Sequence, residues 1–190
     1  KYLNIWICDI SSGATGGLVT AGYASHPYGG MVGSPIDGLV LDYSYGTGNG
    51  DRTATHEVGH YLGLDHPWGN GNCSPNDGIS DTPATDQPTF SCSNHNLMHC
   101  STLTQYENFM DYSNCTMMFT IDQVAVMSAI LNGSRSELLN GNGCSGTEPP
   151  GDCLPTSVNG TSDGDFLDGV SLGGIDNTGS GSTGGPAYHD

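Results

Sequence analysis

The chain has 190 residues, and its 20 acidic side chains outnumber the three basic ones, so its net charge is −17. That length allows one domain with a real hydrophobic core and room for part of another. An acidic surface repels nucleic acid and anionic membranes, and no apolar run is long enough to span a bilayer. We therefore expect neither nucleic-acid binding nor membrane insertion; the negative charge either serves divalent cations or is a plain solvated surface.

Two strands are expected before residue 50. Residues 2–10 alternate in polarity and are rich in branched and aromatic side chains, and residues 37–45 have a similar pattern. A shorter apolar patch lies between them at 18–23. We expect the strand at 37–45 to lie at an edge of its sheet.

A helix is expected at residues 53–62, directly after a glycine-rich turn at 46–50. Asp51 or Thr53 is the expected N-cap, because either side chain can accept a hydrogen bond from a free backbone N–H. Gly63 is expected to end the helix, because glycine readily adopts the positive φ that the backbone needs there.

The string HEVGHYLGLDH within and after this helix is the strongest chemical signal in the chain. His56 and His60 are four positions apart, so both imidazoles can bind one cation from the same helix face. Gly63 lets the backbone leave the helix, and His66 can then supply a third ligand. Glu57 is not a ligand and is placed to accept a proton from a water molecule. Three protein ligands with one position left open indicate a catalytic zinc site rather than a closed structural one.

Residues 67–108 show no convincing periodicity and are rich in Gly, Asn, Asp, Pro and Cys. A loop of that length needs order from another source, and disulfides or bound cations could supply it. The seven cysteines of the chain are Cys8, Cys73, Cys92, Cys100, Cys115, Cys144 and Cys153. None forms a C-x-x-C pair, which argues against a cysteine zinc cage and favours disulfides in an oxidising compartment. The odd number leaves at least one thiol unpaired or paired outside the chain.

A second helix is expected after Thr120, which forms a capping-box pattern with Gln123. Its predicted apolar face consists of Ile121, Val124, Ala125, Ser128 and Leu131. Asn132-Gly133 is expected to end it. Beyond residue 140 the composition changes, and residues 141–155, which contain Pro149-Pro150, are expected to form a linker.

With its third histidine, the string has the form H-E-x-x-H-x-x-G-x-x-H, and the sequence resembles the metzincin zinc metalloproteases. More narrowly it resembles the pappalysin family, with its cytophagalysin- and ulilysin-like members. The segment Asn108-Phe109-Met110-Asp111-Tyr112 is similar to the Met-turn of that family, and Ser80-Asp81-Thr82-Pro83 is similar to its loop after the third histidine. Residues 3–7 and 37–40 resemble its strands before the zinc helix.

The resemblance implies roles for several side chains. Met110 would lie beneath the three histidines as an apolar floor without ligating, and Tyr112 would hydrogen-bond the oxyanion of the tetrahedral intermediate. It also implies the disulfides Cys73–Cys100 and Cys92–Cys115, although the sequence alone allows many other pairings.

Calcium is a further implication, because pappalysin-like enzymes carry it near the loop after the third histidine. The candidate ligands are Asn76, Asp77, Asp81, Thr82 and Asp86. Oxygen-rich side chains of this kind suit a hard cation, but their spacing is not that of an EF-hand. The alternative is a polar, solvated loop.

The resemblance implies an α+β fold of the zincin/metzincin type over residues 1–140, with a mixed sheet, a zinc-binding helix, a Met-turn and a C-terminal helix. The strand and long helix that usually open such a domain are expected to be absent. Residues 156–190 are rich in Gly, Ser, Thr and Asp, with a strand-like stretch at 166–172. They resemble the start of a C-terminal β-sandwich module, and we expect a truncated all-β module there.

Together these features predict a secreted, extracellular zinc-dependent endopeptidase with Glu57 as general base. The expected substrate is an extended peptide or protein segment that pairs with the edge strand near residues 39–43. The main alternative is a non-catalytic acidic adhesion module that binds calcium and structural zinc. A zinc hydrolase acting on glycans or another amide is a second alternative, although no paired-carboxylate glycosidase site is visible.

Overall fold

The computed structural model describes residues 2–10, 20–45, 52–73 and 77–140, together with two strands at 169–172 and 175–178. The chain divides into two compact units, one of Tyr2–Asn140 and one of Gly141–Asp190 with Lys1. Within the described residues, no helix has both the length and the apolar character needed to cross a membrane.

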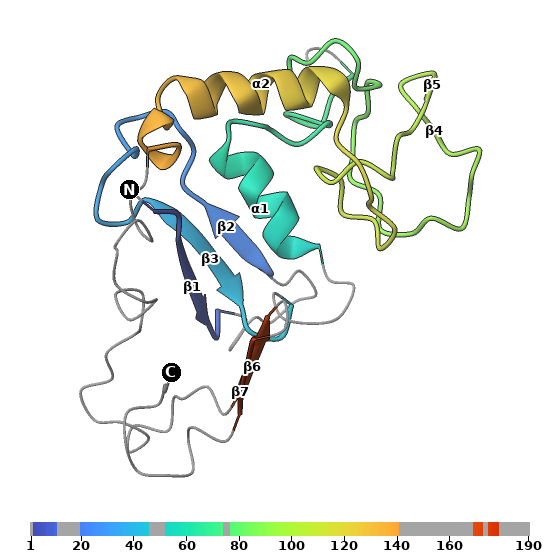
Figure 1. The fold of residues 1–190 in the computed structure, drawn as a ribbon. Helices are drawn as coiled ribbons and strands as arrows, with labels where there is room; N and C mark the ends of the chain where they lie inside the picture. Colours follow the sequence, from blue (N-terminus) through green and yellow to red (C-terminus); the bar gives the residue numbers. More distant parts are fainter. Residues whose placement is uncertain are drawn as a thin grey trace. The chain divides into compact units, whose positions relative to one another are not determined.

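A three-stranded mixed sheet forms the base of the first unit (Figure 1). Its strands are β1 (Asn4–Cys8), β2 (Gly22–Ala24) and β3 (Gly38–Asp42), in the order β1-β3-β2. β1 runs parallel to β3, and β2 runs antiparallel to it. The alternating, branched sequences therefore form strands as predicted.

The prediction that residues 37–45 form an edge strand is wrong, because β3 is the central strand of the sheet. Leu39 and Leu41 are fully or almost fully buried. The aspartates at either end are also buried: the carboxylate of Asp42, for example, accepts hydrogen bonds from the backbone N–H groups of Ile10 and Ser44. Polar residues that flank a strand can thus form hydrogen bonds in the interior of the fold instead of contacting solvent.

Helix α1 (Thr53–Tyr61) packs on β2 and β3. Its N-cap is Arg52, which makes no side-chain capping hydrogen bond. The expected cap at Thr53 is therefore wrong, and Asp51 lies outside the described residues. Gly63 follows the helix with φ of +91°, and its N–H donates to the carbonyl of His60. The predicted glycine stop is confirmed.

Helix α2 (Ile121–Asn132) begins with the predicted capping box: the Thr120 hydroxyl accepts from the Gln123 N–H, and the Gln123 side chain accepts from the Thr120 N–H. The predicted apolar face is wrong, however. Ile121 is 84% exposed and Val124 is 47% exposed, whereas Gln123 is fully buried. A short 3-10 helix, η1 (Ser136–Leu138), follows.

In the described residues of the long segment after α1, the regular structure is one small hairpin, formed by β4 (Met98–His99) and β5 (Thr102–Leu103). Two cysteine pairs join its parts: Cys73 with Cys100, at a Cα–Cα distance of 5.4 Å, and Cys92 with Cys115, at 6.3 Å. These are the pairs that the family resemblance implies. Among the described cysteines, Cys8 is outside any disulfide and exposed.

In the second unit, β6 (Gly169–Leu172) and β7 (Ile175–Thr178) form an antiparallel pair. The predicted linker at 141–155, Cys144 and Cys153, and the rest of the predicted β-module lie outside the described residues.

Candidate metal centre

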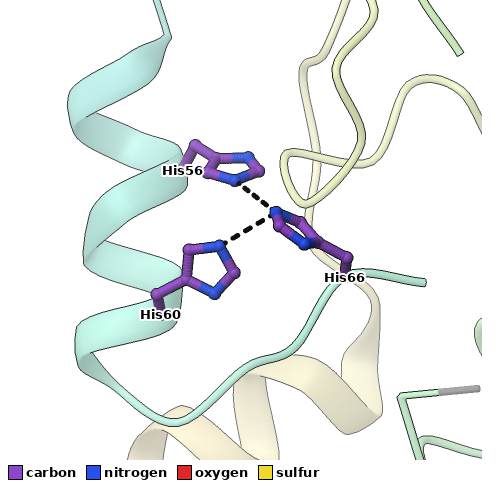
Figure 2. Close-up of side chains that lie close together, drawn as sticks. All are labelled: His56, His60 and His66. Atoms are coloured by element: carbon purple, nitrogen blue, oxygen red, sulfur yellow. Dashed lines mark hydrogen bonds between the residues drawn. The ribbon is translucent and has the colours of Figure 1, made fainter. Parts of the chain in front are cut away.

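The three histidines of the motif meet at one point (Figure 2). His56 and His60 project from α1, and His66 reaches them from the chain that leaves the helix. The Nε2 atom of His66 lies 3.1 Å from the Nε2 atoms of both His56 and His60. The i, i+4 spacing and the glycine turn therefore do what the sequence predicts: they bring three imidazole nitrogens together.

Backbone carbonyls orient two of these rings. The Nδ1 atom of His56 lies 2.7 Å from the carbonyl oxygen of Phe109, and that of His60 lies 2.7 Å from the carbonyl oxygen of Leu64. A carbonyl only accepts, so each Nδ1 carries the proton and donates it. The lone pair of each ring is then on Nε2 and faces the common point.

These donors fit a zinc ion. Burial is the main cause that lowers the pKa of His56 to about 4 and the pKa of His66 to about 3. The neighbouring histidines of the triad lower both pKa values further. Burial also lowers the pKa of His60. All three imidazoles are thus neutral near pH 7, and neutral imidazole is the form that ligates a metal. Lone pairs gathered so closely are stabilised by a shared cation.

Glu57 lies next to the triad on α1 and is 5% exposed. One of its carboxylate oxygens, Oε2, is buried and has no hydrogen-bond partner in the part of the chain that the structure describes. Burial raises the pKa of the Glu57 carboxyl to about 7. Gly22 of β2 packs closely against this side chain, since a Cβ there would lie 3.0 Å from Oε1. An unpartnered carboxylate in this position is available to a reacting group rather than to the fold.

The histidines and Glu57 line a cavity of about 700 Å³. Its wall also includes β2, and residues from Phe109 to Thr116. Tyr112 belongs to this wall: its ring centroid lies 5.5 Å from that of His56 and 5.0 Å from that of His66. Burial, together with the charges of Glu57 and Asp111, raises the pKa of the Tyr112 phenol. The phenol therefore keeps its proton and can donate it in a hydrogen bond.

Met110 is fully buried. Its position as a floor beneath the histidines, which the resemblance implies, stays a prediction. Its sulfur packs against Gly59 of α1 so closely that a Cβ on Gly59 would overlap it. The turn itself is held by Asn108, whose side-chain oxygen accepts a hydrogen bond from the Met110 N–H at 2.9 Å.

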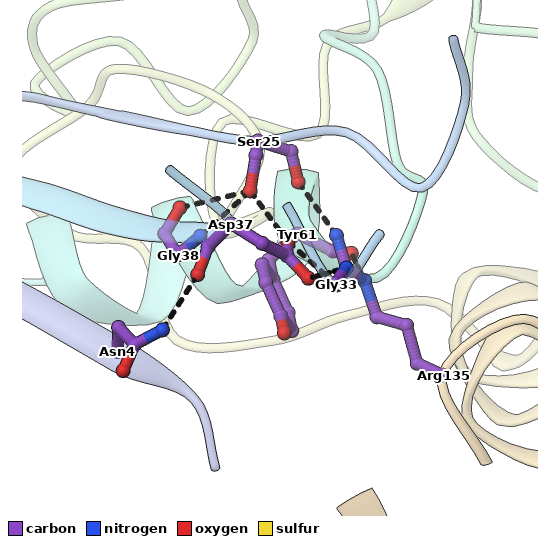
Figure 3. A network of polar contacts seen from close by, with 7 residues as sticks. All are labelled: Asn4, Ser25, Gly33, Asp37, Gly38, Tyr61 and Arg135. Atoms are coloured by element: carbon purple, nitrogen blue, oxygen red, sulfur yellow. Dashed lines mark hydrogen bonds and ion pairs between the residues drawn. The ribbon is translucent and has the colours of Figure 1, made fainter. Parts of the chain in front are cut away.

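A buried arginine fixes the end of α1 (Figure 3). Arg135 is 2% exposed; its Nε donates to the carbonyl of Tyr61 at 2.8 Å, and its NH2 group donates to the carbonyl of Ser25 at 2.9 Å. The remaining nitrogen, NH1, contacts both carboxylate oxygens of Asp37 at 2.8 and 2.9 Å. One side chain thus joins the last turn of α1, the helix that carries His56 and His60, to the ends of β2 and β3.

Of the candidate calcium ligands, Asp77 and Thr82 contact each other, whereas Asp81 and Asp86 have other partners. Asp77 accepts a hydrogen bond from the Thr82 hydroxyl, Asp81 accepts one from the N–H of Asp122 at the start of α2, and Asp86 pairs with His99 at 2.8 Å. Two groups of three described side chains lie close enough together to hold an ion: the histidine triad, and Asp86 with Cys73 and Cys100. The second group is excluded because its two cysteines form a disulfide. Asn76 lies outside the described residues.

Two residues of the site were not predicted. His26, just after β2, lies with its ring 5.2 Å from that of His60 and lines the cavity. Trp68 stacks on His66 with a centroid distance of 4.4 Å. Neither belongs to a local motif; His26 reaches the site through the pairing of β2 with β3, and Trp68 through a turn.

Solved structures of known proteins are similar to this chain in fold and in sequence. Mature mirolysin from Tannerella forsythia, solved with a cleaved peptide, is 34% identical with a TM-score of 0.62, over 73% of this chain and 56% of that one. A mutant of promirolysin is 33% identical with a TM-score of 0.65, over 78% of this chain and 52% of that one. The mixed sheet and helices of this chain are thus similar to those of mirolysin.

Curated relatives are named extracellular metalloproteases. Extracellular metalloprotease 1 of Coccidioides posadasii is 33% identical over 70% of this chain and 51% of its own length. A relative in Arthroderma benhamiae is 42% identical over 40% of this chain and 29% of its own length. The chain therefore spans about half or less of these relatives. The profile of family Peptidase_M43, described as "Pregnancy-associated plasma protein-A", matches residues 1–132. The chain belongs to this family, the pappalysins, as the resemblance of its metal motif and Met-turn predicted.

Proposed function

We propose that this chain contains the catalytic part of a secreted, zinc-dependent endopeptidase. One observation carries the proposal: the Nε2 atom of His66 lies 3.1 Å from those of both His56 and His60, and the neighbouring Glu57 has a buried carboxylate oxygen without a hydrogen-bond partner among the described residues. Its membership of a peptidase family supports this reaction class. The extracellular location rests on the names of the relatives and on the disulfide-bonded cysteines, which suit an oxidising compartment.

Each residue of the site has a role in amide hydrolysis. A bound zinc ion would lower the pKa of water and polarise the scissile carbonyl. Glu57 takes the proton from the attacking water and later delivers it to the leaving amine. Tyr112 donates a hydrogen bond to the carbonyl oxygen as that oxygen gains negative charge. Met110 supports the histidines from below without touching the substrate.

The substrate is proposed to be an extended peptide that adds to the sheet beside the cavity. The expected pairing with residues 39–43 is wrong, because β3 has a neighbour on each side. The edge strand next to α1 is β2, and all three of its residues, Gly22–Ala24, line the cavity. A peptide on β2 would pass directly over the histidines. N-methylation of the substrate's backbone amides should then raise KM, whereas an unchanged KM would contradict this pairing.

The deciding experiment is an assay of casein cleavage by the wild-type chain, by Glu57→Ala and by Glu137→Ala, with zinc content measured for each. Glu137 is an exposed glutamate of η1 and serves as the matched control. We expect wild type and Glu137→Ala to cut casein and to stop when zinc is chelated. Glu57→Ala should bind zinc without cutting. A folded, zinc-loaded wild type that cuts nothing in a broad peptide library would instead support the alternative, a non-catalytic binding module.

Calcium binding by the loop after His66 and a C-terminal β-module stay predictions. Isothermal titration of Ca²⁺ into the zinc-loaded chain, with Asp77→Asn as the variant, tests the first. We expect Asp77→Asn to abolish a binding event that wild type shows; no binding to wild type would rule the site out.

A further inference from the structure

The three metal-binding histidines are not held in the same way. His56 and His60 lie on a helix, and each donates its Nδ1 proton to a backbone carbonyl at 2.7 Å. His66 lies beyond the helix, and within the described part of the chain its Nδ1 atom has no hydrogen-bond partner. A histidine on a loop can rotate about two side-chain bonds, so the direction of its Nε2 atom needs another constraint.

Trp68 provides an aromatic contact at this point. Its indole stacks on the imidazole of His66 with a centroid distance of 4.4 Å and an interplanar angle of 10°. The ring of Tyr112 packs edge-on against both, 4.9 Å from Trp68 and 5.0 Å from His66. His66 thus contacts two aromatic side chains, one roughly parallel and one roughly perpendicular to its plane, and these two also contact each other.

The local sequence builds this stack. The N–H of Gly69 donates to the carbonyl of His66 at 2.9 Å, which closes a β-turn with Pro67 and Trp68 at its centre. Proline suits the second position of a turn because its φ is already set. A second turn follows, closed by the Gly71 N–H and the Trp68 carbonyl at 2.8 Å. The two turns fold the indole back over the histidine two residues before it.

We propose that Trp68 is a positioning residue for the third metal ligand. The flat indole holds the plane of the His66 ring so that its Nε2 atom faces those of His56 and His60. It replaces the carbonyl that orients each of the other two rings, but it leaves the His66 tautomer unconstrained. This inference rests on the proposed zinc centre.

Zinc affinity tests the inference, measured by competition with a chromogenic chelator on metal-free protein. Trp68→Leu keeps apolar volume without a flat ring, and Trp68→Phe keeps a flat ring. We expect Trp68→Leu to bind zinc 10–100-fold more weakly, the usual cost of losing an outer partner of a ligand. Trp68→Phe should stay within a few-fold of wild type. Circular dichroism and thermal melting of the metal-free variants verify that all are folded.

The outcomes separate this inference from the function on which it rests. Wild type that binds no zinc removes the metal centre and the inference together. Zinc bound equally well by wild type and Trp68→Leu overturns the positioning role and leaves the metal centre intact. A Trp68→Phe variant as weak as Trp68→Leu also overturns it, because a flat ring would then not be the cause.

Fluorescence offers a second measurement that does not depend on activity. The chain has two tryptophans, so Trp6→Phe leaves Trp68 as the only indole. Co²⁺ in the histidine site should quench its emission, and the quenching should saturate at one equivalent. If Co²⁺ binds, as its absorption bands report, and the emission of Trp68 does not change, the stack does not exist in solution.

Discussion

In the proposed mechanism, Tyr112 combines two functions in one side chain. Its ring contacts the imidazoles of His56 and His66, and the residue lines the same cavity as these histidines. The ring contacts concern the geometry of the metal ligands, whereas the hydroxyl concerns the charge that develops on the substrate. Substitution by phenylalanine separates the two, because phenylalanine keeps the ring and removes the proton donor.

We therefore expect Tyr112→Phe to lower kcat by about 10²–10³, the range for loss of one oxyanion donor, with little change in zinc affinity. Steady-state kinetics on a peptide substrate and zinc competition measure the two effects. A variant with normal kcat would show that the hydroxyl does not contact the reacting oxygen. Lost zinc affinity in this variant would indicate that the hydroxyl acts on the metal site.

At the scale of elements, α2 supports the metal site through a chain of buried side chains. The Gln123 side-chain oxygen accepts a hydrogen bond from Asn108 at 2.9 Å, and Asn108 holds the Met110 N–H at 2.9 Å. The intervening carbonyl, that of Phe109, receives the Nδ1 proton of His56. Gln123, in the capping box of α2, is thus connected to His56 on α1.

We expect Gln123→Ala to lower the free energy of unfolding by about 1–3 kcal/mol, because Asn108 would lose a partner in the interior. Gln87→Ala is the matched control: Gln87 is exposed, and its loss should change stability by less than about 0.5 kcal/mol. Urea unfolding of the metal-free proteins measures both. Equal stability of the two variants would show that the Asn108 contact contributes nothing.

At the scale of the whole first unit, Arg135 and Asp37 connect parts of the chain that are almost one hundred residues apart. Burial alone raises the pKa of the Asp37 carboxyl. Hydrogen bonds from Gly33 and Ser25, and then the Arg135 guanidinium, more than offset this effect, so the net pKa lies below its usual value. The carboxylate is therefore more stable in the folded chain than in the unfolded one.

The pH dependence of stability follows from that sign. The stabilisation of the fold by Asp37 is fully present above the unfolded pKa of about 3.9. It is lost as the pH falls through the lower pKa of the folded state. Asp37→Asn leaves Arg135 buried without its counter-ion, and we expect it to cost about 3–5 kcal/mol at pH 7. The difference in free energy of unfolding between Asp37→Asn and wild type, measured by urea unfolding, should become smaller below pH 4. A difference that is the same at pH 7 and pH 3 would contradict this assignment.

The sequence by itself determined the features that depend on short-range geometry. The spacing of His56 and His60 places them on one helix face, Gly63 ends that helix, and the Thr120 capping box starts the next one. These depend on backbone geometry over a few residues, which is the same in any fold. The family resemblance added Met110 and Tyr112 to the site. The structure brings the ring of Tyr112 to His56 and His66, and it packs the sulfur of Met110 against Gly59 of α1.

Only the tertiary structure decided which surfaces these elements bury. Composition suggested an edge for residues 37–45 and an apolar face through Ile121 and Val124, but β3 is central and those helix residues are exposed. Among the candidate calcium ligands, Asp77 and Thr82 contact each other, but Asp81 and Asp86 contact Asp122 and His99. His26, Trp68 and Arg135 reach the site or its supports through strand pairing, a turn and a long-range ion pair. Such contacts depend on which segments meet in space, and no local pattern records that.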